Sequence, residues 1–211
     1  MKRCVLISGA SISDYGFAKK YLRAEDFCIF CDCGLVHAGK LGIKPDLIVG
    51  DMDSFTGELP SAEIIKLPAV KDDTDTFFAA KEALRRGFKE VLMLGAIGER
   101  FDHTMGNISV LMMLNKSGAE ARLIYDRSEI SVISPDGASD TVLISDECRY
   151  FSVIAAGGPA KGVTIENAVY PLENAVIMPE YQYGISNEVL PGKTAKVSAA
   201  DGTLMIVKIF S

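Results

Sequence analysis

Short apolar runs rich in β-branched residues alternate with helix-like patterns through the first part of the chain. Each run is three or four residues long and gives way to a polar or glycine-containing segment, as buried strands do. The runs lie at residues 5–8, 27–30, 47–49, 64–67, 91–94 and 122–125. Because strands that alternate with helices form parallel sheets, we expect a parallel sheet with helices on both faces.

The segments between these runs place apolar residues three or four positions apart, which is the spacing of a helix face. Gly42, Gly87 and Gly118 follow three of these segments and predict where the helices end. The expected faces are Tyr15, Ala18 and Leu22; Leu35, Ala38 and Leu41; Phe77, Ala80 and Leu84; and Met105, Ile108 and Met112.

After residue 126 the pattern changes to short β runs separated by turn clusters, with no amphipathic helix of useful length. These runs lie at residues 130–133, 141–144, 150–154, 162–165, 194–197 and 204–209, with Val189 as a further strand position. We therefore predict an N-terminal Rossmann-like parallel α/β domain over residues 1–126. A small all-β domain, a β-sandwich with a barrel as the alternative, is expected over residues 127–211.

The chain is acidic, with 22 lysine and arginine residues against 28 aspartate and glutamate residues among 211. Nucleic acids and anionic membranes select basic surfaces, so we predict that it binds neither. No apolar run approaches the roughly 20 residues that cross a bilayer. Five cysteines, an odd number, fit reduced thiols in a cytoplasmic protein better than a disulfide scaffold.

Three of the cysteines, Cys28, Cys31 and Cys33, lie close together in the sequence with His37 nearby, which raises the alternative of a zinc site. Side chains alternate between the two faces of a strand, so Cys28 and Cys31 are expected on opposite faces. No second cysteine pair follows at the spacing of a zinc finger. We therefore expect these cysteines to act as small buried apolar residues.

Aspartates follow nearly every strand of the predicted parallel sheet. Ligands of such sheets bind at the carboxyl ends of the strands, so these side chains are expected to converge at one edge. Carboxylates that converge repel one another unless cations compensate, and a divalent metal ion is the simplest compensation. They are Asp32 after the second run, Asp51 and Asp53 after the third, Asp72, Asp73 and Asp75 after the fourth, and Asp102 beyond the fifth.

The sequence Gly-Asp-Met-Asp-Ser at residues 50–54 is the centre of this group. Two carboxylates one residue apart can share a hard cation, and Mg²⁺ prefers oxygen ligands together with water and substrate phosphates. We expect Asp51 and Asp53 to bind Mg²⁺, with Asp75 as the third ligand. Either Asp73 or Thr74 is expected to cap the helix that follows.

Residues 95–103 join a strand to a helix through a glycine-containing turn, where backbone N–H groups can receive phosphate oxygens. Arg100 adds a bidentate donor, and the alternative is a surface ion pair between Arg100 and Glu99 or Asp102. Residues 8–11 form another possible phosphate loop. They lack the dinucleotide fingerprint and the Walker lysine, so neither a Rossmann dehydrogenase nor a P-loop kinase is expected.

Taken together, these motifs resemble the thiamine pyrophosphokinase family over nearly the whole chain. In the first half the resemblance lies at residues 31–35, 50–54, 71–75 and 99–103, and in the second half at residues 162–164, 170–172 and 184–188. The resemblance implies transfer of a pyrophosphoryl group from ATP to the hydroxyl of thiamine, giving thiamine diphosphate and AMP with Mg²⁺. It also implies a homodimer whose thiamine site is shared between the α/β half of one subunit and the β half of the other.

The resemblance further implies roles for individual residues of this chain. Asp51, Asp53 and Asp75 are implied as catalytic metal and phosphate ligands; Arg100 as a catalytic phosphate ligand; Asp32, Lys71, Asp72, Thr74, Asp102 and His103 as parts of the ATP site; and Tyr170, Ser186 and Asn187 as thiamine ligands. A lone histidine at a helix start is also typical of a structural hydrogen bond, which is the alternative for His103. The chain departs from the family pattern at Glu99, Cys33 and Leu35, in the nucleotide pocket.

The chemistry fits the residues independently of the resemblance. Charge develops on the phosphate oxygens during transfer, and a metal ion with Arg100 would offset it. Either Asp75 or Asp72 is expected to accept the proton of the attacking hydroxyl. Two alternatives belong to other classes: a metal-dependent nucleotide-sugar transferase, which leaves the β half unexplained, and a non-catalytic thiamine or nucleotide binding protein.

Overall fold

The computed structural model describes residues 3–51, 60–68, 72–181 and 183–211. The chain divides into two compact units. Unit 1 comprises Met1–Leu114 and Ala121–Asp126, and unit 2 comprises Asn115–Glu120 and Arg127–Ser211. Among the described residues, no helix is long and apolar enough to cross a membrane.

Unit 1 contains the predicted parallel sheet, and all six expected strands are present within a few residues of their predicted ends. The strands are β1 (Cys4–Ile7), β2 (Phe27–Cys31), β3 (Leu47–Gly50), β4 (Glu63–Lys66), β5 (Glu90–Leu94) and β6 (Glu120–Tyr125), in the order β4-β3-β2-β1-β5-β6. The pairs β1–β2, β1–β5, β2–β3 and β3–β4 are parallel. Every residue of β1 and β3 is buried, as expected for strands that are covered on both faces.

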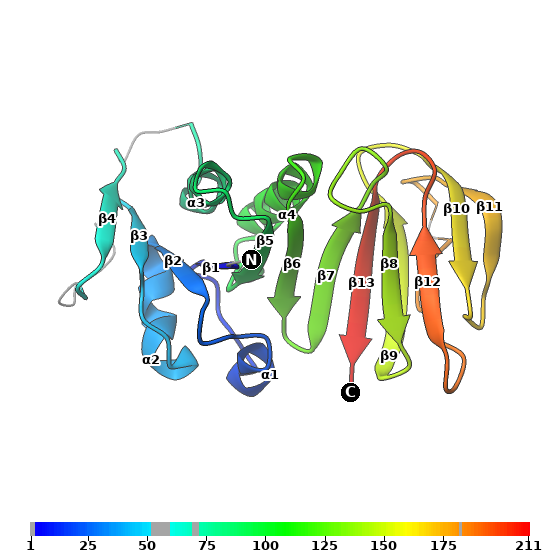
Figure 1. The fold of residues 1–211 in the computed structure, drawn as a ribbon, viewed down its shortest axis with the longest axis horizontal. Coiled ribbons are helices and arrows are strands. Elements are labelled where there is room, and N and C mark those ends of the chain that lie inside the picture. Colours follow the sequence, from blue (N-terminus) through cyan, green and yellow to red (C-terminus); the bar gives the residue numbers. More distant parts are fainter. Residues whose placement is uncertain (1–2, 52–59, 69–71, 182) are drawn as a thin grey trace. The chain divides into compact units, whose positions relative to one another are not determined.

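Helices connect the strands of unit 1. In Figure 1, α3 and α4 lie above β1 and β5 and α1 and α2 lie below them, so both faces are covered. The elements are α1 (Tyr15–Lys19), the 3₁₀ helix η1 (Asp32–His37), α2 (Ala38–Leu41), α3 (Asp75–Arg85) and α4 (Phe101–Lys116). The segment predicted as a single helix up to Leu41 is thus a 3₁₀ turn followed by one α-helical turn, which ends at Gly42 with φ 75°.

The apolar face predicted for α4 is wrong. Met105 is 51% exposed, whereas Asn107, Val110, Leu111 and Leu114 are buried. The reason is the polar Asn107, whose amide donates to the Ala96 carbonyl at 2.7 Å and is therefore satisfied inside the protein. A pattern of apolar residues alone does not detect a face that contains a satisfied asparagine.

The face predicted for α3 is partly wrong as well. Phe77 and Leu84 are only half-buried, while the small residues Ala79, Ala80 and Ala83 are fully buried. The helix packs against β1, β2 and β3, and small side chains let it approach this sheet closely.

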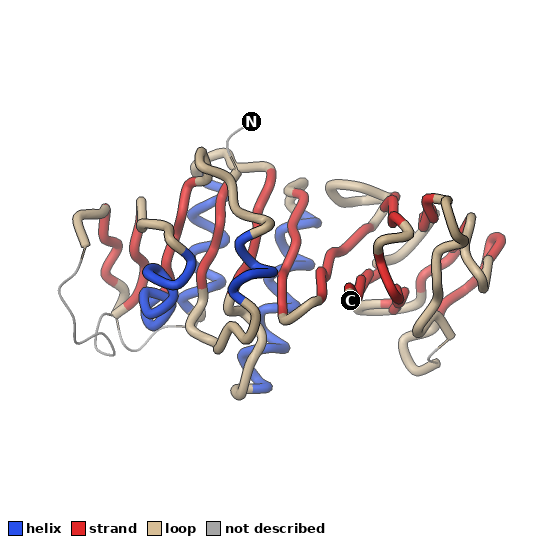
Figure 2. The backbone as a smooth tube through the Cα atoms, turned by 90° about the horizontal axis from the view of Figure 1, so that it is seen from below, coloured by secondary structure: helices blue, strands red, loops and turns tan. Residues whose placement is uncertain are grey.

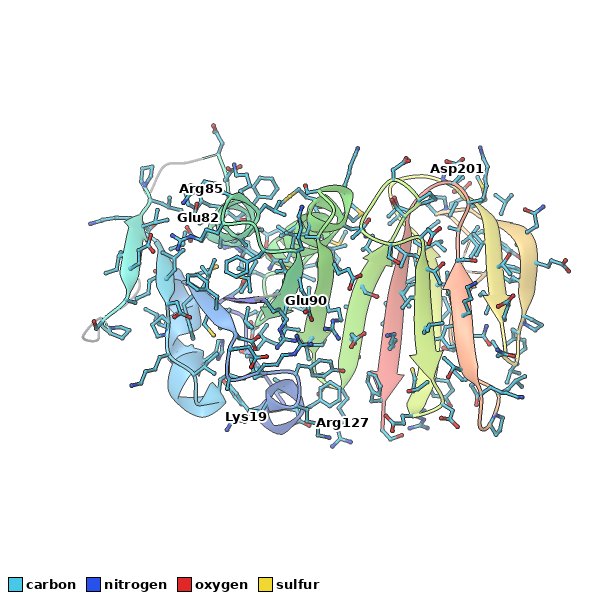
Figure 3. The ribbon with its side chains drawn as sticks, viewed as in Figure 1. Lys19, Glu82, Arg85, Glu90, Arg127 and Asp201 are labelled. Atoms are coloured by element: carbon cyan, nitrogen blue, oxygen red, sulfur yellow. The ribbon has the colours of Figure 1, made fainter. Side chains whose placement is uncertain are left out.

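Two carboxylates of unit 1, those of Glu82 and Asp26, are buried and paired with arginines. Glu82 on α3 accepts hydrogen bonds from Arg85 at 2.6 and 2.7 Å and from Arg86 at 2.6 Å. These donors, Arg85 first, lower the pKa of Glu82 to about 2. Figure 3 labels Glu82 and Arg85 on α3, and Glu90 lower in the same unit. Arg3 lies with Asp26 in the interior, both 2% exposed, with a 2.6 Å contact.

Unit 2 is an all-β sandwich, as predicted. Its strands are β7 (Ser128–Ile133), β8 (Thr141–Ser145), β9 (Cys148–Ala155), β10 (Ala160–Glu166), β11 (Leu172–Ile177), β12 (Thr194–Ser198) and β13 (Leu204–Phe210). They form two antiparallel groups, β7-β13-β9 and β11-β10-β12-β8. Phe151, Val153 and Ile206 from the first group share one core with Ile165 and Val197 from the second. Figure 2 shows this part of the chain built from strands and loops.

Strand β11 was not predicted from the sequence. Its residues Glu173 and Asn174 interrupt the apolar pattern, and Asn174 has φ 48°. The strand pairs with β10 through register shifts and lies at the edge of its sheet, where polar residues and irregularities are common. Val189, expected in a strand, forms an isolated bridge with Ala168.

Cys28 and Cys31 are buried as expected, Cys4 and Cys148 are buried too, and all five cysteines are free thiols. The expectation is wrong for Cys33, which is exposed. It lies beyond the end of β2, in η1, and therefore has no sheet neighbours to bury it.

We expect Leu111→Ala to lower the free energy of unfolding by about 2–5 kcal/mol, because it leaves a cavity under α4 where Leu111 is fully buried. The matched variant Met105→Ala, on the exposed face of the same helix, should change it by no more than about 0.5 kcal/mol. Urea denaturation of both variants measures the difference. Equal losses of unfolding free energy in the two variants would indicate that Met105 is buried as the sequence pattern predicted.

Candidate active site

The chain order of the parallel sheet reverses beside β1. From β1 the chain proceeds to β2, β3 and β4 on one side, then crosses to β5 on the other side of β1. The loops that follow β1 and β5 diverge at such a point and leave a crevice outside the carboxyl ends of the strands. The topology therefore places the ligand site of unit 1 at this edge.

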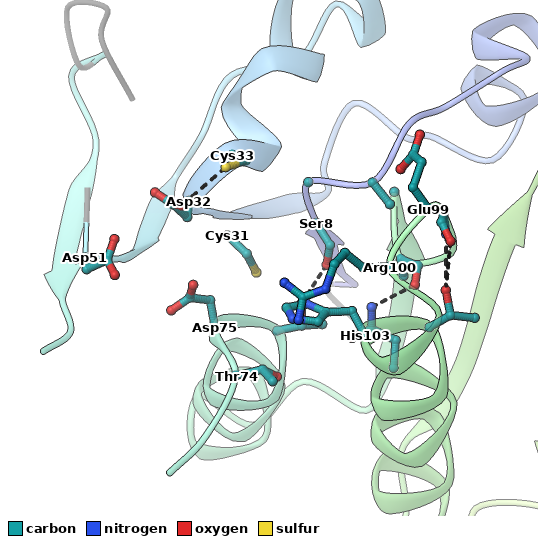
Figure 4. A pocket seen from close by; sticks show the side chains of 18 residues that line it. Ser8, Cys31, Asp32, Cys33, Asp51, Thr74, Asp75, Glu99, Arg100 and His103 are labelled. Carbon is teal, nitrogen blue, oxygen red and sulfur yellow. Dashed lines mark hydrogen bonds between the residues drawn. The ribbon is translucent and has the colours of Figure 1, made fainter. Parts of the chain in front are cut away.

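A cavity of about 430 Å³ lies at this edge. It is lined by the loops after β1, β2, β3 and β5, by the start of α3 and by the first turns of α4 (Figure 4). Of the predicted site residues, it contains Asp32, Asp51, Thr74, Asp75, Arg100 and His103. Asp72 and Asp102 are not among the lining residues, and Asp53 and Lys71 lie outside the described residues.

Three aspartate carboxylates face this cavity, from the first residue of η1, the residue after β3 and the first residue of α3: Asp32, Asp51 and Asp75. Oxygen Oδ2 of Asp32 accepts a hydrogen bond from Cys33 Sγ at 3.3 Å. Its other oxygen, Oδ1, is buried without a hydrogen-bond partner. A buried carboxylate oxygen without a hydrogen-bond partner in the protein costs free energy, so this oxygen is suited to accept a ligand.

The position of Asp32 depends on its neighbour strand. Asp32 has φ 37°, a left-handed conformation that is uncommon for residues other than glycine. A Cβ atom on Gly50, at the end of β3, would lie 2.9 Å from the Cβ of Asp32. Gly50 is therefore required for the close approach of β3 to the Asp32 turn.

The start of α3 settles which residue caps this helix. The Thr74 hydroxyl accepts a hydrogen bond from the Phe77 N–H at 3.2 Å, so Thr74 is the cap. Asp73 forms an ion pair with Lys81 instead. Asp75 is the first residue of the helix, where a negative charge is favoured by the helix dipole.

A buried hydrogen bond joins α3 to the end of β1. Ser8 Oγ and Thr76 Oγ1 are 2.8 Å apart. Cys31 lies beside this pair in the interior, and desolvation by burial raises the pKa of its thiol to about 12. Cys31 is therefore a protonated, unreactive part of the cavity floor. Sequence reasoning missed Thr76, although its position one residue after Asp75 places it at the same sheet edge.

The loop between β5 and α4 is held at several points. Gly95 has φ 60°, and a Cβ atom there would lie 2.3 Å from the Ser8 carbonyl oxygen. The Gly98 N–H donates to Thr104 Oγ1 at 3.2 Å, and the Asn107 amide donates to the Ala96 carbonyl. The loop is thus fixed to both β1 and α4 before any ligand binds. Asn107 was missed because a lone helix asparagine gives no sequence signal.

Arg100 forms an ion pair with Asp102 at the rim of the cavity, as one alternative predicted. The contacts are 3.0 Å from Nε and 2.6 Å from Nη2, and the Arg100 guanidinium lowers the pKa of Asp102. Both side chains are about two-thirds exposed, so the pair contributes little to stability. The guanidinium is therefore available to exchange its partner for a phosphate.

Glu99 accepts a hydrogen bond from Ser11 Oγ at 2.7 Å, and this bond lowers its pKa. The bond joins the loop after β1 to the loop after β5. On the other side of the β1 loop, His37 Nε2 lies 3.0 Å from the Ala10 carbonyl oxygen, and Tyr15 Oη lies 2.7 Å from His37 Nδ1. His37 is buried and is therefore a structural support of this loop.

Within the described ranges, no three histidine, cysteine or acidic side chains meet closely enough to hold a metal ion. The donors that line the cavity are nevertheless carboxylate oxygens, the type that Mg²⁺ prefers, and one of them has no partner. The donor chemistry of the cavity thus fits a hard divalent cation.

Unit 2 contains a cavity of similar size, about 440 Å³, with aromatic and aliphatic walls. Tyr170 and Asn187, both predicted ligands, line it, together with Tyr183, Ile185 and Leu172. Sequence reasoning missed Tyr183, which is 55% exposed and stacks on Tyr181 with ring centroids 6.2 Å apart. The Tyr-x-Tyr pattern in a loop was the available signal.

Ser186 does not line this cavity, although the sequence predicts it as a ligand. It is exposed and has φ 58°. The Ser186 N–H donates to Ser152 Oγ at 3.1 Å, which fixes the backbone of the turn.

Comparison with known proteins places both units in one family. The family model described as "Thiamin pyrophosphokinase, catalytic domain" matches residues 18–123, and "Thiamin pyrophosphokinase, vitamin B1 binding domain" matches residues 140–204. The chain belongs to the thiamin pyrophosphokinase family. This agrees with the resemblance that the sequence motifs indicated.

Individual members of the thiamin pyrophosphokinase family are similar over most of their length. Thiamine pyrophosphokinase from Bacillus subtilis (strain 168) is 30% identical over 196 residues, which cover 89% of each chain. Thiamine pyrophosphokinase 1 from Oryza sativa subsp. japonica is 33% identical over 149 residues, covering 64% of this chain and 55% of the rice protein. The crystal structure of the Bacillus subtilis protein superimposes with a TM-score of 0.87 at 26% identity, covering 100% of both chains.

We expect Gly95→Ala to destabilise the protein by about 1–3 kcal/mol or more, because alanine disfavours the positive φ and its Cβ would meet the Ser8 carbonyl. Nucleotide affinity should fall with it, since the loop shifts. Gly106→Ala is the matched control: Gly106 lies in α4 with nothing near its Cβ position, so alanine should stabilise by about 0.5–1 kcal/mol. Thermal unfolding and nucleotide titration measure the stability and the nucleotide affinity of the two variants. Unchanged stability of Gly95→Ala would contradict the close contact with Ser8.

Proposed function

We propose that this chain is a thiamine pyrophosphokinase that transfers the pyrophosphoryl group of ATP to the hydroxyl of thiamine, yielding thiamine diphosphate and AMP. The observation that carries the proposal is the pairing of two cavities with two family matches. Apart from Ser8, Gly9 and Ala10, the carboxylate cavity lies in the segment matched by the catalytic domain. The aromatic cavity lies entirely in the segment matched by the vitamin B1 binding domain.

Each half of the chain has its own role in this proposal. Residues 1–126 form the ATP and metal domain, and residues 127–211 form the thiamine domain. In the first, Asp51 and Asp75 with Asp53 are the Mg²⁺ ligands. The unpartnered oxygen of Asp32 in the same cavity supports a cation there. Bound Mg²⁺ would neutralise the negative charge of the phosphates.

The remaining residues of the cavity bind and orient ATP. Arg100 exchanges Asp102 for a phosphate oxygen and stabilises the charge that develops during transfer. Thr74 and His103 line the cavity beside it, and the backbone N–H groups of the β5–α4 loop face phosphate oxygens at the start of α4. Lys71 and Asp72 complete the ATP site, and Asp102 holds Arg100 in place before ATP arrives.

The proton of the thiamine hydroxyl passes to a carboxylate in this reaction. The sequence leaves Asp75 and Asp72 as alternatives. Asp75 lines the cavity and Asp72 does not, so we assign the proton acceptor to Asp75. Most of the rate enhancement comes from positioning and charge stabilisation, because phosphoryl transfer requires no covalent enzyme intermediate.

Thiamine binds in the aromatic cavity of unit 2, with Tyr170 stacked on one of its rings and Ser186 and Asn187 in the adjoining turn. A thiazolium is a cation, so an aromatic face attracts it by about 0.5–2 kcal/mol. We propose that the active form is a cytoplasmic homodimer in which the carboxylate cavity of one copy and the aromatic cavity of the other act on the same thiamine. The free thiols of all five cysteines support a reducing compartment.

One assay tests the activity itself. The purified chain is incubated with ATP, Mg²⁺ and thiamine, and AMP and thiamine diphosphate are measured, with thiamine omitted in the control. Release of AMP that requires thiamine supports the proposal. Thiamine binding without AMP identifies a non-catalytic binding protein, and turnover of a nucleotide sugar in place of ATP identifies a sugar transferase.

We expect Asp75→Asn to lower kcat by about 10²-fold or more while the chain stays folded, because the amide keeps the size of the ligand and removes its charge. Asp136→Asn, in an exposed turn of unit 2, is the matched control and should leave kcat unchanged. Circular dichroism verifies the fold of both variants. Near-normal turnover of Asp75→Asn at saturating Mg²⁺ would remove Asp75 from the metal site.

Mixed dimers test whether the site is shared between copies. Asp75→Asn removes a carboxylate of the first cavity and Tyr170→Ala weakens thiamine binding in the second, so neither variant alone turns over appreciably when thiamine is kept far below the KM of Tyr170→Ala. If each site combines two copies, mixing these variants under conditions of subunit exchange creates dimers with one intact site. Activity should then recover to about a quarter of normal, because half of the dimers are mixed and each has one of two sites intact. No recovery, with exchange shown by mass spectrometry, would place the whole site within one chain.

A further inference from the structure

Asn187 is a buried polar residue beside the aromatic cavity of unit 2. It is 4% exposed. Its Oδ1 accepts hydrogen bonds from the Tyr170 N–H at 3.0 Å and from the Glu188 N–H at 2.9 Å. Its Nδ2 donates to the Tyr170 carbonyl at 2.8 Å. An amide oxygen accepts two hydrogen bonds, so Oδ1 is already satisfied within the protein.

The backbone of Asn187 forms hydrogen bonds with a residue of β9, Phe151. The Asn187 N–H donates to the Phe151 carbonyl at 2.8 Å, and the Phe151 N–H donates to the Asn187 carbonyl at 2.9 Å. The backbone therefore holds one sheet of the sandwich, and the side chain holds the segment that leads into β11 of the other. Asn187 joins the two at the mouth of the aromatic cavity.

The adjoining residues show why a side chain is needed at this point. The Val169 N–H donates to the Glu188 carbonyl at 2.9 Å, and Ala168 and Val189 form a bridge. These contacts pair the two segments through their backbones up to residue 169. At Tyr170 the backbone partner is missing because Asn187 pairs with Phe151, and the Asn187 amide takes its place by bonding both the N–H and the carbonyl of Tyr170.

The ring of Tyr170 is the group that this arrangement positions. It is 65% exposed, so few side-chain contacts hold it, while both polar groups of its backbone are fixed by one buried amide. Pro171 follows directly and restricts the backbone further. The direction in which the ring leaves the backbone, along the wall of the cavity, thus depends on Asn187.

We propose that Asn187 is a positioning residue for thiamine: it fixes the Tyr170 backbone so that the ring is preorganised against the substrate, and it does not contact thiamine itself. This inference rests on the proposed function. It replaces the direct hydrogen bond to the substrate that the family resemblance implies for Asn187. Preorganisation lowers the cost of ordering the ring when thiamine binds.

A double-mutant cycle separates positioning from direct contact. Steady-state kinetics are measured for Asn187→Ala, Tyr170→Ala and the double variant, with thiamine and ATP varied in turn. We expect Asn187→Ala to raise KM for thiamine about tenfold, as the loss of buried hydrogen bonds would. The KM for ATP should not change. In the Tyr170→Ala background, the Asn187→Ala substitution should have little further effect, because a residue that acts through Tyr170 has nothing left to position.

A conservative pair of variants controls for folding. Asn187→Asp keeps an acceptor oxygen for the Tyr170 and Glu188 N–H groups and replaces the donor to the Tyr170 carbonyl by a carboxylate oxygen, so it should also raise KM for thiamine. Asn167→Asp removes an amide donor at an exposed position, to the Thr194 carbonyl at 3.0 Å, and Asn167 does not line the cavity. It should leave KM unchanged. If Asn187→Ala does not fold, Asn187→Asp takes its place in the cycle with Tyr170→Ala.

The outcomes are distinct. Multiplicative effects of the two substitutions on KM for thiamine would show that Asn187 contacts the substrate and would overturn the inference, as would an unchanged KM in both Asn187 variants. Wild-type protein that releases no AMP would instead overturn the proposed function. In that case the cycle is measured by calorimetric titration of the wild type, the two single variants and the double variant with thiamine, and Kd takes the place of KM. A wild-type chain that binds no thiamine overturns the inference as well.

Discussion

The loops at the carboxyl edge of the parallel sheet pack so closely that a single added carbon would collide with their backbone. One such contact is between Gly95 and the Ser8 carbonyl, where a Cβ atom would lie at 2.3 Å. It joins the loops on the two sides of the switch point, and the Ser8–Thr76 hydrogen bond extends the same contact to α3. The positions of Asp75 and of the β5–α4 loop both depend on this close packing, because α3 and the loop are each anchored to the end of β1.

Charge is distributed differently at the two ends of this sheet. Toward the amino ends of the strands, Glu90 is surrounded by Arg3, Arg23 and Arg122, at 3.7, 3.1 and 2.8 Å. At the carboxyl ends the aspartates face a cavity whose guanidinium group, that of Arg100, is already paired with Asp102. Glu90 is thus compensated by arginines of the protein, whereas the described aspartates of the carboxyl edge line a cavity that a cationic ligand can enter.

Much of this organisation could be read from the sequence, because buried parallel strands give continuous apolar runs and aspartates after them are easily seen. The helix faces were harder. Asn107 in α4 is buried through a hydrogen bond that no periodicity reveals, and α3 buries alanines rather than Phe77. Strand β11 was not predicted because edge strands tolerate polar residues, such as Glu173, that interrupt the apolar pattern. The pairing of Arg100 with Asp102 and the capping by Thr74 each required coordinates to choose among alternatives that the sequence left open.

The convergence of Asp32, Asp51, Asp75 and Glu99 on one cavity also has a thermodynamic consequence for the whole of unit 1. Four like charges repel one another, and one buried oxygen has no hydrogen-bond partner within the protein, so these side chains oppose the folding of the chain that brings them together. A cationic ligand that binds only the folded cavity relieves this repulsion. Occupancy and folding are then linked by mass action, and the resistance of unit 1 to unfolding and to proteolysis rises with the concentration of whatever fills the site.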